Sequence, residues 1–408
     1  MKATVKDGIL LGYNRLRKAI YCLRNARHCM ISGTTGAGKT FAIFRFIIYA
    51  IVNCIGLLIV DGKGDIGKGS ILEFVSAFCK KHNRQLYVID MNDPSHSAKY
   101  NPLKDANETV AKDMLINMTE WSEPHYRANA ERYLQRLIKL MKLAEIPLSF
   151  HSVIQNMSRE RFESLSATLQ KNGVISKEVY LEDLQLSKTS GAIAEQAAAR
   201  YATIAESEIG QIFAADGIDI YTAVQSGTVI LFILNPLTYP ETSKAMGRLI
   251  LIDAKKAVSK LFKQDKRSFF VFDEAGSYAS PVLTDLINKS RSAGVTNVVA
   301  VQSLSDLEAA AGEAFKNQIL ENCNNYIVLR QNSYSSAEQW AKTIGTKEKM
   351  EMTFQTNQSE ATGLGSAKRT RSFICHPDTV KSFSTGEGIF VSRDTGECER
   401  IKIAKPII

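Results

Sequence analysis

The feature that most limits the folds open to this chain is an eight-residue motif, Gly33-Thr34-Thr35-Gly36-Ala37-Gly38-Lys39-Thr40. It fits the full GxxxxGK[ST] pattern, and it lies between an apolar run, Cys29 to Ser32, and a segment of helical character. Its glycines allow backbone amides to surround phosphates, because a β-carbon would obstruct that approach. Lys39 is expected to reach the β and γ phosphates of ATP, and the Thr40 hydroxyl to bind Mg²⁺. The motif therefore predicts a triphosphate-binding loop at a strand-to-helix turn.

Short apolar and β-branched runs recur along the chain with helical stretches between them, and they predict a doubly wound, mostly parallel sheet. After Cys29 to Ser32 these runs are Leu57 to Asp61, Leu86 to Asp90, Val229 to Leu234, Phe269 to Phe272, Val298 to Val301, Tyr326 to Leu329 and, last, Gly388 to Ser392. The apolar stretch Phe41 to Val60 contains Arg45 and Asn53. We interpret it as a buried helix followed by a buried strand, not as a membrane span.

Between the third and fourth of these runs, Leu103 to Ile218 has no strand pattern and carries helical spacing, as in Leu134, Leu137 and Met141. The alanine-rich stretch Gly191 to Ala205 fits the same interpretation. We expect a discontinuous P-loop nucleotide-binding domain, residues 1–103 and 219–408, and an inserted all-α domain, residues 104–218. The polar segment from Thr353 to Thr370, rich in Gly, Ser and Thr, predicts a mobile loop.

Composition adds weaker indications about compartment and partner. The net charge of +9 over 408 residues is compatible with a polyanionic partner and equally with an ordinary soluble enzyme. The seven cysteines are scattered and form no Cys/His cluster, so we expect a reducing compartment and no structural zinc. No signal-peptide pattern opens the chain. The expected location is the cytosol or a surface facing it.

A P-loop requires an acidic partner for Mg²⁺ at the end of a buried strand, and Phe269 to Phe272 leads directly into Asp273-Glu274. Asp273 is the expected magnesium ligand, and Glu274 is the expected group that orients and deprotonates the attacking water. The alternative is a strand that merely ends in two solvated acids. The four large apolar residues before them favour the catalytic interpretation.

Three further polar features follow predicted strands. Gln302 leaves the end of Val298 to Val301, where open α/β sheets bind ligands, and it is a candidate γ-phosphate sensor or a simple strand cap. Arg291 precedes that strand and is either a solvated side chain or an arginine finger acting on a neighbouring subunit, a role for which Arg330 is the alternative. The turn Asp61-Gly62-Lys63-Gly64-Asp65 places charges at the same sheet edge.

Taken in order, these elements resemble the conjugative coupling ATPases of the TraD, TraG and TrwB group, which belong with the FtsK and HerA DNA pumps. The segments that carry the likeness are the P-loop, Asp61 to Asp65, Tyr100-Asn101-Pro102-Leu103, Phe272-Asp273-Glu274-Ala275, and Arg291 to Gly294 leading to Gln302-Ser303-Leu304. The resemblance implies a RecA-like P-loop NTPase fold with an inserted all-α domain, using ATP and Mg²⁺.

The resemblance also implies an ATP-driven motor that delivers DNA, largely independently of sequence, with a relaxase to a type IV secretion channel. Its expected partners are DNA and relaxosome or secretion-channel proteins, and its expected assembly is a homo-hexamer, or a monomer in isolation. The alternatives are a related secretion ATPase that powers protein export or channel assembly, and a nucleotide-binding scaffold without hydrolysis. Intact Lys39, Asp273 and Glu274 argue against the scaffold.

In one respect the chain departs from that group. Its members usually carry N-terminal membrane helices before the ATPase domain, whereas about 30 residues precede this P-loop. We therefore expect a location at the cytosolic face of the inner membrane, reached through partners or through a missing N-terminal segment.

Overall fold

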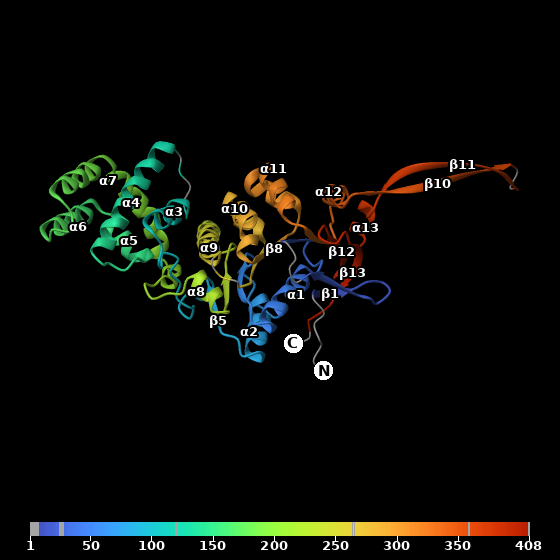
Figure 1. Ribbon diagram of the computed structural model, residues 1–408, viewed down its shortest axis with the longest axis horizontal. Helices are drawn as coiled ribbons and strands as arrows, with labels where there is room; N and C mark the ends of the chain where they lie inside the picture. The colour runs from blue at the N-terminus through green and yellow to red at the C-terminus, as the bar shows by residue number, and fades with distance from the viewer. Residues whose placement is uncertain are drawn as a thin grey trace. The chain divides into compact units, whose positions relative to one another are not determined.

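The computed structural model describes residues 8–23, 28–118, 121, 123–262, 264, 266–357 and 360–406, with side chains described for all of these except 353–366. The chain forms two compact units, Met1–Phe46 with Ala300–Ile407 and Ile47–Val299 with Ile408. Each unit is described by itself below (Figure 1).

The second unit is built on parallel strands in the order β8-β7-β4-β6-β5. They are β4 (Gly56–Asp61), β5 (Leu86–Asp90), β6 (Val229–Ile233), β7 (Ser268–Asp273) and β8 (Val295–Val301), whose last two residues belong to the first unit. Every residue of β4, β6 and β7 is buried, as expected for parallel strands covered on both faces. The helices of this core are α2 (Ile71–Lys81), α8 (Ile220–Gln225), α9 (Pro240–Leu261) and α10 (Pro281–Ser290), with short 3₁₀ turns η2 (Ala275–Ser277) and η3 (Arg291–Ala293).

Between β5 and β6 the described residues form helices joined by turns and contain no strand beyond isolated bridges at Tyr100, as the sequence predicts. It contains α3 (Glu108–Met118), α4 (Pro124–Leu143), α5 (Phe150–Asn156), α6 (Arg159–Lys171), α7 (Lys177–Ala205) and η1 (Glu208–Ile212), drawn mainly in green in Figure 1. The predicted alanine-rich helix is the second half of α7. Tyr133 stacks on Phe162 with ring centroids 4.5 Å apart, so aromatic packing holds α4 to α6. The division into domains at residues 104 and 218 remains a prediction.

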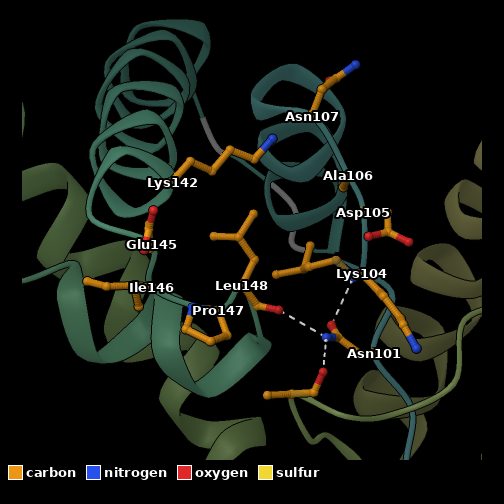
Figure 2. A pocket seen from close by; sticks show the side chains of 12 residues that line it. Asn101, Lys104, Asp105, Ala106, Asn107, Lys142, Glu145, Ile146, Pro147 and Leu148 are labelled. Atoms are coloured by element: carbon orange, nitrogen blue, oxygen red, sulfur yellow. Dashed lines mark hydrogen bonds between the residues drawn. The ribbon is translucent and has the colours of Figure 1, made fainter.

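The Asn101 side chain links the point at which the chain enters this helical segment to residues inside it and near its end. The buried Asn101 side chain donates to the carbonyls of Leu148 and Ala215, both at 3.0 Å, and accepts from the Leu103 amide. These residues line a cleft of about 650 Å³ whose walls come from the segment before α3, from the end of α4 and from the turn that follows α4 (Figure 2). Asn101 thus uses its amide group to fix the base of the helical segment.

A buried lysine on α9 also holds this entry segment. Lys256 Nζ lies 2.8 Å from the Pro102 carbonyl, and it pairs with Asp219 at 3.1 Å and Asp253 at 2.9 Å. Tyr100 donates to Asp253 at 3.0 Å. Burial and the charge of Asp219 raise the pKa of Asp253, although Lys256 opposes the shift. The buried lysine charge is therefore paired with two buried carboxylates.

The first unit contains the P-loop strand and a set of antiparallel strands, in the order β2-β1-β13-β12-β9-β3. The strands are β1 (Gly8–Tyr13), β2 (Ala19–Leu23), β3 (Cys29–Ser32), β9 (Asn325–Leu329), β12 (Glu387–Ser392) and β13 (Cys398–Ile403). The helices of this unit are the start of α1 (Lys39–Val52), α11 (Leu304–Asn322), α12 (Tyr334–Ile344) and α13 (Pro377–Lys381). β3 and β9 pair in parallel, whereas β12 pairs antiparallel with β9 and β13. All the predicted strands are confirmed, and so is the α/β class.

The prediction of a mobile loop from Thr353 to Thr370 is wrong. This segment belongs to a long antiparallel ribbon formed by β10 (Thr346–Asn357) and β11 (Glu360–Phe373), which Figure 1 shows beyond α12 and α13. The segment resembles a loop because it is polar and contains glycine, unlike the continuous apolar runs by which the buried strands are recognised. Its strands are paired over most of their length instead.

Candidate active site

The eight residues of the motif form the turn between β3 and α1, as predicted. Gly36 and Gly38 adopt φ values of +74° and +102°, which only glycine reaches without strain. A β-carbon on Gly38 would lie 2.9 Å from the Gly386 nitrogen, so close approach also requires glycine there. Lys39, the first residue of α1, is buried, and its Nζ donates to the Gly33 carbonyl at 2.8 Å. Thr40 follows it on α1 and is half-buried.

Backbone contacts from two neighbouring strand ends hold the start of the loop. The Gly33 amide donates to the Val301 carbonyl at 3.2 Å, and the Thr34 amide donates to the Arg330 carbonyl at 2.9 Å. Because β8 and β9 end at this level, their carboxyl ends flank the loop on the first unit, where ligands of open α/β sheets bind. The structure thereby places the backbone of Arg330 against the loop.

Gln302 lies at this loop, where a sensor is expected. Its side-chain oxygen accepts from the Thr35 hydroxyl at 3.4 Å, and its backbone amide donates to Asp306 at 3.1 Å. Asp306 also caps α11, because it accepts from the Ser303 amide. A nearby amide group, that of Asn332, donates to the Thr34 hydroxyl at 3.3 Å. The structure therefore brings Gln302 together with the P-loop.

The turn before β12 braces the far side of the loop, and no sequence pattern indicates it. The Thr385 hydroxyl donates to the Gly36 carbonyl at 3.0 Å, and the Gly386 amide donates to the Ala37 carbonyl at 2.8 Å. Lys402 on β13 donates in turn to the Thr385 carbonyl. The C-terminal part of the chain thus fixes the curvature of the phosphate-binding loop.

On the second unit, Asp273 is the last residue of β7 and Glu274 follows it in an unusual conformation. Asp273 is 5% exposed, while Glu274 is half-buried. Glu274 has φ 46° and ψ 44°, a left-handed conformation that residues with a β-carbon seldom adopt. Its carbonyl accepts from the Ser277 amide at 3.0 Å, which begins η2. Backbone strain of this kind gathers at functional sites, where surrounding structure maintains it.

The Asp61 turn lies directly beside Asp273. Asp61 ends β4 and is 1% exposed, and its carboxylate accepts from the amides of Lys63 at 2.9 Å and Gly64 at 3.3 Å. The Gly62 amide donates to the Asp273 carbonyl at 3.1 Å, and a β-carbon on Gly62 would lie 2.8 Å from that oxygen. Tyr278, also buried, donates to the same carbonyl at 3.1 Å. Two donors therefore fix the backbone at Asp273.

Arg291 occupies a different setting on this unit. It begins η3 after α10, and its side chain is exposed. Its carbonyl accepts from Gly294, whose φ of +74° turns the chain into β8. An exposed guanidinium fits a group that acts on another molecule, and equally a solvated side chain.

A family comparison decides what kind of P-loop protein this is. Residues 19–403 match the family described as type IV secretion-system coupling protein DNA-binding domain. The chain belongs to this family. The resemblance to coupling ATPases that the motifs indicate is thereby confirmed.

Solved structures of coupling proteins have the same fold. The bacterial conjugative coupling protein TrwBdeltaN70, in its unbound monoclinic form, superposes with a TM-score of 0.69 at 14% identity, over 99% of this chain and 91% of that chain. The plasmid coupling protein TrwB in complex with ADP and Mg²⁺ gives 0.64 at 14% identity, over 95% and 88%. VirB4 of Thermoanaerobacter pseudethanolicus gives 0.61 at 14% identity, over 98% and 97%. Identities this low show the fold alone.

One curated relative of this coupling-family chain matches a shorter stretch. An uncharacterized protein of Mycoplasma pneumoniae is 29% identical over 104 residues, which is 25% of this chain and 69% of that protein.

Among the described residues, none of the helices combines the length and the apolar character that crossing a bilayer requires.

Proposed function

We propose that this member of the coupling-protein family is an ATP-driven DNA translocase that delivers DNA, with a relaxase, to a type IV secretion channel during conjugation. The observation that carries the proposal is an intact triphosphate loop, closed around Lys39 and braced by Gln302 and Thr385, in a chain that matches the family over residues 19–403. A P-loop alone indicates only nucleotide binding. The family membership supports DNA as the cargo.

The proposed cofactors are ATP and Mg²⁺. Lys39 neutralises the β and γ phosphates, the loop amides surround them, and Thr40 and Asp273 bind the metal. Glu274 orients and deprotonates water, and Gln302 senses the γ-phosphate. TrwB has been solved with ADP and Mg²⁺ and with a non-hydrolysable ATP analogue, which supports this choice of cofactors.

The proposed working form is a homo-hexamer at the cytosolic face of the inner membrane, held there by partners or by a further segment. In it Arg291, or alternatively Arg330, acts as an arginine finger on the neighbouring subunit's ATP. The exposed position of Arg291 at η3 supports the first choice. DNA is gripped largely through its phosphates, because a pump must accept any sequence.

The test is the ATPase rate per subunit, measured against protein concentration with and without random-sequence duplex DNA. We expect the rate to rise with assembly and with DNA, and Arg291→Ala to abolish the rise with concentration. Lys39→Ala is the inactive control. A rate that stays the same at every DNA concentration at low salt would rule out the translocase.

The alternative is a related secretion ATPase that exports protein or assembles the channel. The fold that this chain shares with VirB4 is compatible with that function. The two functions differ in the polymer that binds. We would measure the mobility shift of random-sequence DNA and the capture of a secreted protein with the same preparation. The comparison separates the two functions. Binding of the protein alone would favour the alternative.

A further inference from the structure

The β10–β11 ribbon stands apart from every other strand in the described part of the chain. It forms a two-stranded sheet of its own, and the described side chains on its base, 346–352 and 367–373, are exposed or half-buried. An isolated two-stranded ribbon is marginally stable in water. We therefore infer that a binding partner stabilises a ribbon of this length.

The register of the ribbon sorts its charges onto two faces. Partners across the ladder share a face, so Lys347 opposite Ser372, Lys349 opposite Thr370 and Lys368 opposite Glu351 lie together. We call this set the lysine face. It has three cations, two hydroxyls and one carboxylate, and its three lysines are exposed. The opposite face carries Met350 and Met352, which are 53% and 63% exposed, and also the exposed charged residues Glu348, Arg369 and Arg371.

We propose that the lysine face of the β10–β11 ribbon binds the sugar–phosphate backbone of duplex DNA. The inference rests on the proposed DNA translocase and assigns one of its grips on the cargo. Lysines and hydroxyls are the side chains that contact phosphates without reading sequence. A two-stranded β-ribbon also matches the width of the major groove, whose flanking phosphates such a face would reach. The lysine face has three cations against one carboxylate, whereas the opposite face has two arginines against one carboxylate and also carries the exposed methionines. The larger positive excess of the lysine face makes a nucleic acid its complementary partner.

The experiment measures duplex binding of the full chain as a function of salt, using random-sequence DNA of about 30 base pairs. Lys347, Lys349 and Lys368 are replaced together by Gln. We expect weaker binding to every sequence, and a slope of log K against log salt that shrinks by about 0.9 for each lost phosphate contact. Replacing the same three lysines by Arg should restore wild-type binding, because it keeps the charge.

Two controls make the assignment specific. Met350→Gln with Met352→Gln alters the opposite face and should leave DNA binding unchanged. The second control replaces Lys80, Lys244 and Lys266, three exposed lysines outside the ribbon, by Gln. It removes the same net charge and should change the slope of log K against log salt little. If the lysine-face variant binds as the wild type does, or if the methionine pair weakens binding as much, the inference is overturned. If the wild-type chain binds no DNA, the proposed translocase fails with it.

Discussion

Asp61 and Asp273 are direct partners in the parallel ladder of β4 and β7, so two carboxylates end adjacent buried strands at the same level. Gly62 connects them, because its amide donates to the Asp273 carbonyl. The Asp61 turn therefore belongs to the support of the expected magnesium ligand.

Asp61 should make the stability of this unit depend on pH. Burial raises its pKa from the ordinary 3.8 to about 6, although the Lys63 and Gly64 amides oppose the shift. A carboxyl whose pKa is higher in the folded state stabilises that state when protonated, so its contribution is lost as pH rises from about 4 to about 6. In nucleotide- and magnesium-free protein, the free energy of unfolding relative to Asp61→Asn should fall across this interval. Asp65→Asn is the control, because Lys63 lowers the pKa of Asp65 and its contribution has the opposite sign.

Glu274→Gly should raise the free energy of unfolding and abolish ATP hydrolysis. Glycine relieves a left-handed conformation that costs other residues about 1 kcal/mol, so chemical denaturation should show a free energy of unfolding higher by up to about that amount. ATP hydrolysis should be lost with the carboxylate. Glu145→Gly, at φ 55°, should gain similar stability and keep hydrolysis. Marked destabilisation at position 274 would show that no strain is stored there.

Thr385→Val should weaken ATP binding without unfolding the protein. It removes one hydroxyl that donates to the Gly36 carbonyl, a hydrogen bond worth about 0.5–1.5 kcal/mol, so the dissociation constant should rise about 2- to 10-fold. Titration with a fluorescent ATP analogue measures this. Thr379→Val on α13 is the matched control. Equal affinities for the two variants would mean that the turn does not shape the loop.

Two adjacent lysines on α9 should differ sharply when each is replaced by Met. Lys256 is 6% exposed and pairs with two buried aspartates, so Lys256→Met should cost about 3–5 kcal/mol of unfolding free energy. Lys255 pairs with Asp285 at the surface, and its removal should cost about 0–1 kcal/mol. Urea denaturation of both variants tests the comparison. Similar midpoints would contradict a stabilising role for the buried network.

The sequence predicts the parts of the site that local patterns specify. A continuous apolar run such as Phe269 to Phe272 has few alternatives to a strand buried on both faces, and the P-loop glycines follow from their backbone conformations. Gln302 could be placed near the loop because it ends such a strand. The roles of Arg291 and Glu274 in catalysis stay predictions.

Contacts between distant parts of the chain have no local pattern. Thr385 and Gly36 are 349 residues apart, and nothing near either residue indicates the hydrogen bond between them. Lys256 resembles any surface lysine in sequence, since its burial depends on carboxylates brought in from other elements. The β10–β11 ribbon was missed because most of its residues are polar and its described base is exposed or half-buried, so the short alternation of Met350, Met352 and Phe354 with polar residues is its only strand signal.

The helical segment begins and ends close to Asn101, which bears on whether the segment can be removed from the chain. The Tyr100 amide donates to the Ile212 carbonyl and the Asn101 amide donates to the Ile218 carbonyl. The points at which the chain leaves the sheet and returns to it therefore lie side by side. Segments whose ends lie together can be shortened or exchanged at little cost in closure entropy. We therefore expect that the helical segment can be removed as a module, and that a short linker between its two ends leaves a remainder that folds and still binds ATP, which circular dichroism and nucleotide titration would measure.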